Sequence, residues 1–88
     1  MRRRDNEYDF IDPIVIRILN KSTTPLQPLA INFMVNRVTK EIIPFHAVKE
    51  RLRILVNEGK VSEKVKNDGA KDISFYYTNF MLRNSKEM

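Results

Sequence analysis

The stretch that decides the fold runs from Ile43 to Val61 and reads IPFHAVKERLRILVNEGKV. Its apolar residues recur at spacings of three, four and three, which places them on one buried face of an α-helix. These residues are Phe45, Val48, Leu52 and Leu55. Pro44 suits the start of a helix, and Gly59 suits the position just after its end, where the backbone takes a positive φ. The pattern predicts a helix between these two residues.

The residues that follow, 61–77, read VSEKVKNDGAKDISFYY. Two runs rich in β-formers, 61–65 and 73–78, flank a polar segment that contains Asp-Gly, a common hairpin signal. We therefore expect two short antiparallel strands joined by a loop of several residues, 66–71. Alternation along the second strand places Ile73, Phe75 and Tyr77 on one face and Ser74, Tyr76 and Thr78 on the other.

Two further helices are expected before this unit. Asp12-Pro13 is a helix start, with aspartate as the cap and proline in the first turn, and helical spacing of apolar residues predicts a helix over 13–21. Residues 22–25 form a loop by composition. A mostly apolar run predicts a second helix over 28–37, and the connection 38–43 leaves room for a further helical turn.

Three helices and a hairpin can close one small core. The segment from Val48 to Val61 resembles the winged helix-turn-helix family, in which the third helix ends in a polar residue, a glycine and a hydrophobic entry to the wing. The segment Phe75-Tyr76-Tyr77-Thr78 is similar to the aromatic strand that closes the wing. The resemblance covers about 12–82 and implies an α+β winged helix that binds DNA. The long connection before the third helix departs from the family pattern.

Length and composition bound the remaining possibilities. The 88 residues predict one domain over 12–82, with a flexible arm over 1–11 and a short tail over 83–88. The absence of cysteine excludes disulfides and thiolate chemistry and fits a cytoplasmic protein. No apolar run is long enough for a membrane span, and the charged start MRRRDNEYDF lacks the apolar region of a secretory signal.

Catalytic motifs are missing as well. One histidine and two glycines exclude histidine-cluster zinc sites and phosphate-cradling loops, so we expect no enzyme, no cofactor and no small-molecule ligand. Four acidic residues gather near the N-terminus, where a solvated arm with one helix cap explains them better than a divalent cation. They are Asp5, Glu7, Asp9 and Asp12.

The net charge of +5 favours a polyanionic partner. In the third helix, Glu50, Arg53 and Asn57 lie within about 40° of His46 around the helix axis, and Lys49 flanks this face. The resemblance implies that this face enters the major groove, where arginine bonds guanine, glutamate accepts from cytosine and lysine touches phosphate. A solvated helix face is the alternative, and His46 is equally well explained as an exposed residue without a role.

Other basic residues are candidates for the DNA backbone. Lys64, Lys66 and Lys71 surround the hairpin turn, where edge-strand protection is a compatible explanation. Arg2, Arg3 and Arg4 form an arm that suits a minor groove. Arg37 and Lys40 precede the third helix and suit phosphate contacts.

The phenylalanines are spread one per element, as a shared core requires, whereas Tyr76 faces away and is free to stack or touch phosphate. These phenylalanines are Phe10, Phe33, Phe45, Phe75 and Phe80. Ile54, Val56 and the apolar residues 80–82 fit no core stripe and suit a partner surface, so monomer and homodimer remain equally open.

The sequence thus predicts a small, sequence-specific double-stranded DNA-binding protein that regulates transcription. A winged helix used only for protein–protein contact, as a complex subunit, is the alternative. Glu50 and Glu63 favour that alternative, because both repel phosphates.

Overall fold

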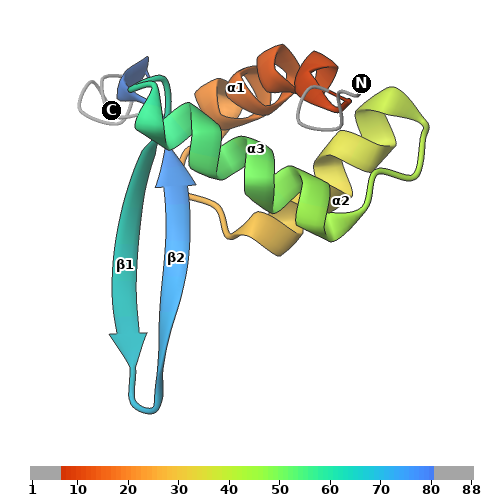
Figure 1. Ribbon diagram of the computed structural model, residues 1–88. Helices are drawn as coiled ribbons and strands as arrows, with labels where there is room; N and C mark the ends of the chain where they lie inside the picture. The colour runs from red at the N-terminus through yellow and green to blue at the C-terminus, as the bar shows by residue number, and fades with distance from the viewer. Residues whose placement is uncertain (1–6, 81–88) are drawn as a thin grey trace.

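In the computed structural model, which describes residues 7–80, three helices precede a two-stranded antiparallel hairpin that projects from them (Figure 1). This order confirms the predicted α+β architecture. The elements are η2 (Asp9–Ile11), α1 (Asp12–Lys21), α2 (Pro28–Thr39), α3 (Phe45–Asn57), β1 (Ser62–Asp68) and β2 (Lys71–Tyr77).

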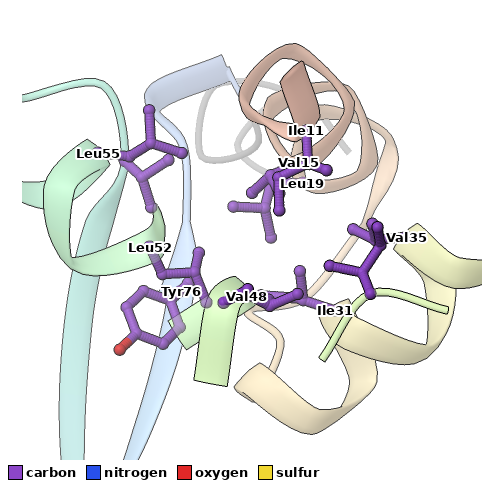
Figure 2. Close-up of a cluster of buried hydrophobic side chains, with 12 residues drawn as sticks. Ile11, Val15, Leu19, Ile31, Val35, Val48, Leu52, Leu55 and Tyr76 are labelled. Atoms are coloured by element: carbon purple, nitrogen blue, oxygen red, sulfur yellow. The ribbon is translucent and has the colours of Figure 1, made fainter. Parts of the chain in front are cut away.

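The core lies where the three helices meet the base of the hairpin (Figure 2). The predicted α3 stripe is confirmed at three of its four positions, because these three side chains are fully buried while Phe45 is 39% exposed. Phe45 is the first residue of α3 and so lies at the end of the stripe. The fully buried residues are Ile11, Val15, Leu19, Ile31, Val35, Val48, Leu52 and Leu55.

Asp12 does not cap α1 as predicted, because its carboxylate is bound elsewhere. The guanidinium of Arg51 donates from Nε to Oδ1 at 2.9 Å and from Nη2 to Oδ2 at 2.6 Å. This pair joins the first turn of α1 to the middle of α3. The residues just before α1 belong to the folded domain, because the side chain of Ile11 is fully buried and its amide donates to the carbonyl of Tyr8 at 3.1 Å.

The connection between α2 and α3 contains no further helical turn. Helix α2 runs two residues past its predicted end, and Lys40 then adopts a left-handed conformation with φ 61°. Two asparagines of α2 hold the connection: Asn32 donates to the carbonyl of Ile43 at 2.9 Å, and Asn36 accepts from the Ile43 amide at 2.7 Å. Since Ile43 is also buried, the connection is fixed against α2 directly before α3 begins.

The hairpin is longer and tighter than predicted. Its register runs from Ser62 opposite Tyr77 to Asp68 opposite Lys71, so the expected loop of several residues is wrong. Only Gly69 and Ala70 connect the strands, and Gly69 has the positive φ (75°) that such a two-residue turn requires at its first position.

One backbone bridge ties the base of the hairpin to the segment before α2. The amide of Leu26 donates to the carbonyl of Tyr76 at 3.0 Å, and the amide of Tyr76 donates to the carbonyl of Leu26 at 2.8 Å. Tyr76 is therefore held in the core at 8% exposure, and the prediction that it faces outward is wrong.

Candidate nucleic-acid interface

The exposed face of α3 and the adjacent face of the hairpin enclose an open groove. All five residues predicted for the recognition face of the third helix line it: His46, Lys49, Glu50, Arg53 and Asn57. The opposite wall comes from the hairpin and consists of Glu63, Ser74 and Tyr76. Helical periodicity therefore located the α3 side of the groove but carried no signal for the hairpin side.

An ion pair occupies the middle of the α3 face. Arg53 donates from Nε to Oε1 of Glu50 at 3.3 Å, and its Nη2 pairs with Oε2. This hydrogen bond lowers the pKa of Glu50 and raises the pKa of Arg53. Both side chains are more than half exposed, so water and salt compete readily with the pair. The guanidinium is available to another acceptor once it leaves Glu50.

A second carboxylate faces the groove from the hairpin. Oε2 of Glu63 accepts from the hydroxyl of Ser74 at 2.7 Å and from the hydroxyl of Tyr76 at 3.4 Å. Burial, followed by the charge of Glu63 and this hydrogen bond, raises the pKa of Tyr76. The hairpin wall is therefore acidic and polar.

We expect Tyr76 to ionise above its ordinary pKa and Glu63→Gln to bring that pKa down, because the substitution removes the neighbouring charge. Tyrosinate absorbance would be titrated in a variant with Tyr8→Phe and Tyr77→Phe. The raised pKa means that the folded protein favours protonated Tyr76. The contribution of this group to the free energy of unfolding is therefore complete below its unfolded-state pKa and is lost as the pH rises through its folded-state pKa. An unchanged Tyr76 titration in Glu63→Gln would contradict this assignment.

The predicted wing lysines lie on the other face of the hairpin. Glu63 is paired with Tyr76, whereas Lys64 is paired with Phe75 and Lys66 with Ile73. Since neighbouring residues of a strand point to opposite faces, Lys64 and Lys66 point away from the α3 groove. Lys71 lies opposite Asp68 at the tip, on the same face as these two lysines.

The remaining predicted contacts are also outside the groove. Arg37 lies in the last turn of α2, and Lys40 follows that helix. The three N-terminal arginines fall outside the described residues 7–80. The acidic cluster falls partly outside them as well, and residues 7–80 contain no group of three or more metal-ligating side chains. Within the same residues no helix is both long and apolar enough to cross a membrane.

The prediction that the phenylalanines form the core is wrong. Four of them, Phe10, Phe33, Phe45 and Phe80, are between 39% and 62% exposed. Three of the five phenylalanines have a cation near the ring instead: Arg37 lies 5.8 Å from the centroid of Phe33, Lys49 lies 5.5 Å from that of Phe45, and Lys66 lies 5.8 Å from that of Phe75. These contacts, typically worth about 0.5–1 kcal/mol at exposed sites, stabilise aromatic rings at the surface.

The three-helix core with its hairpin defines this chain as a winged-helix protein. Its structure is similar to the crystal structure of a PadR family transcriptional regulator from Eggerthella lenta DSM 2243, with a TM-score of 0.58 and 21% sequence identity. The similarity covers 84% of this chain and 66% of that chain, just under two thirds of its length. At this identity the likeness shows a common fold. No protein-family model matches the sequence, and comparison with curated proteins finds no match.

Proposed function

We propose that this protein binds double-stranded DNA through α3 and regulates transcription. The observation that carries the proposal is the gathering of His46, Lys49, Arg53 and Asn57 on one exposed face of α3, beside the projecting hairpin. A helix of this kind fits the major groove of B-form DNA. The net charge of +5 and the fold shared with a transcriptional regulator support the same conclusion.

Arg53 and Asn57 suit base contacts, since arginine bonds guanine and asparagine bonds adenine in the major groove. Lys49 lies at the flank of this face and suits a phosphate. The hairpin projects beyond the α3 face (Figure 1), and Lys66 and Lys71 in its tip half suit the DNA backbone beside the groove that holds α3. Glu50 has two roles in this arrangement: it holds Arg53 in the free protein and accepts from cytosine in the complex.

Arg53→Ala is expected to weaken binding to the selected target duplex by about 1–3 kcal/mol and to relax the sequence preference. Fluorescence anisotropy with target and random duplexes would measure both losses. Arg53→Lys is the matched control, because it keeps the charge but removes the bidentate geometry. Equal losses on target and random DNA would exclude a base-reading role.

Lys66→Ala is expected to weaken binding to all duplexes alike and to reduce the salt slope by about one. The reason is that a lysine on the hairpin contacts phosphate and releases a counterion. The same anisotropy titrations, repeated across salt concentrations, would measure the slope. A sequence-dependent loss would contradict the phosphate assignment.

The decisive first experiment is the salt dependence of binding to random-sequence duplex DNA, from about 50 to 200 mM. A steep loss of affinity supports the proposal and justifies selecting a target sequence. No binding at the lowest salt concentration would instead favour a protein–protein module. Glu50 and Glu63, which both face the groove, are the observation that favours this second candidate.

A further inference from the structure

A second groove lies between α2 and the face of the hairpin that points away from α3. Its walls are apolar except for Gln27: Leu29, Ala30 and Phe33 of α2, Pro25 and Leu26 before that helix, and Phe75 of β2. Leu29 and Phe33 lie one helical turn apart and are 64% and 62% exposed. A continuous apolar patch of this kind on a soluble protein commonly marks an interaction site.

The rim of this groove is positively charged. Arg37 lies over the ring of Phe33, and Lys66 lies over the ring of Phe75. Lys64 is paired directly opposite Phe75. The sequence contains no aspartate or glutamate from residue 13 to residue 40, so α2 and the segment before it contribute no negative charge.

Two of the three carboxylates of the hairpin lie away from this groove. Glu63 and Asp72 belong to the face that points toward α3, whereas Asp68 shares the groove-side face but lies at the tip, paired with Lys71. An apolar floor with a rim on which cations outnumber carboxylates complements a ligand that is both apolar and acidic.

We propose that this groove binds an acidic amphipathic segment of a partner protein. Apolar side chains of the segment pack on Leu29, Phe33 and Phe75, and its carboxylates pair with Arg37 and Lys66. Helix-in-groove recognition works in this way, with anchors spaced at helical intervals. The site lies apart from the α3 groove, so a bound partner leaves the α3 face exposed and competes with DNA only for Lys66.

Positive charge argues against two other occupants of this groove, namely a second copy of the chain and the ends of the chain itself. A second copy of the chain also carries +5 and would bring the same cations together. The two ends of the chain are basic too: residues 1–6 contain three arginines and one aspartate, and residues 81–88 contain one arginine, one lysine and one glutamate.

The test is to select peptides of about 12 residues from a random library on the full chain and to measure their affinities by fluorescence anisotropy. We expect the selected peptides to combine leucine or aromatic anchors with an excess of aspartate and glutamate. Phe33→Ala should weaken them about tenfold or more, as expected for an aromatic anchor. Arg37→Glu should weaken them as well, and exchanging a peptide glutamate for lysine should restore binding to this variant.

Leu29→Asn separates this site from the DNA site. The variant should lose peptide affinity, keep its duplex DNA affinity and retain its melting temperature, because Leu29 is largely exposed and lies outside the α3 groove. Selected peptides without acidic excess, or with unchanged affinity for Phe33→Ala, would overturn the proposal. Binding of an oligothymidine that depends on Phe33 would also overturn the proposal. The same holds for a homodimer that dissociates in Phe33→Ala.

Discussion

Arg51→Ala is expected to lower the free energy of unfolding by up to about 3–5 kcal/mol, because it removes one partner of a largely buried ion pair and leaves the partly buried carboxylate of Asp12 without this cation. The side chain of Arg51 is 8% exposed and that of Asp12 is 20% exposed. Hydrogen bonding to Asp12 is the largest influence on the pKa of Arg51 and raises it above its ordinary value. Urea unfolding followed by circular dichroism would measure the loss.

The exposed pair of Glu50 and Arg53 is the matched control for this prediction. Glu50→Ala removes an ion pair of the same chemistry that also involves α3, yet both partners are at the surface, so we expect little change in the free energy of unfolding. Replacing Asp12 and Arg51 together with leucine should recover much of the stability lost in Arg51→Ala, since the paired burial cost also disappears. Similar losses for the buried and the exposed pair would contradict this account.

Leu52→Ala is expected to lower the free energy of unfolding by about 2–5 kcal/mol, because it leaves a cavity in a packed core. Leu52 is fully buried on α3 beside Val48 and Tyr76 (Figure 2). Since Arg53 follows it directly, the same loss of packing also loosens the face that we propose for DNA. Thermal and urea unfolding would measure the stability, and duplex binding would measure the consequence.

Phe33→Ala is the control for the core substitution. It removes a larger side chain than Leu52→Ala, but that side chain is 62% exposed, so we expect it to cost less than about 1 kcal/mol, mostly the contact with Arg37. If Phe33→Ala were as destabilising as Leu52→Ala, Phe33 would belong to the core that the sequence predicts.

Helical periodicity predicted the helices well because it is a property of local sequence. The spacing of Val48, Leu52 and Leu55 sufficed to place the buried side of α3, and the polar side followed from it. The phenylalanines were predicted to lie in the core because they are hydrophobic, yet four of them are exposed. The sequence does contain a signal for their exposure: Phe33 and Arg37, like Phe45 and Lys49, are four residues apart and meet on one helix face.

The features that the sequence did not reveal depend on contacts between distant residues. Asp12 and Arg51 are separated by 39 positions, and nothing local distinguishes this aspartate from a helix cap. The length of the hairpin was underestimated because residues 66–68 have low β-propensity, whereas pairing with the opposite strand determines their conformation. Which face of the hairpin meets α3 likewise depends on the bridge between Leu26 and Tyr76.

The bridge between Leu26 and Tyr76 fixes the base of the hairpin, so a small rotation there moves the distant tip. From Tyr76 to Lys71 the strand rises about 16 Å at the usual 3.3 Å per residue, so each 5° of rotation at the bridge displaces the tip by about 1.4 Å. Packing around the buried Tyr76 therefore sets the position of Lys71, although the two residues are five positions apart. Substitutions at the bridge should retune where the wing meets a duplex while leaving every basic residue in place.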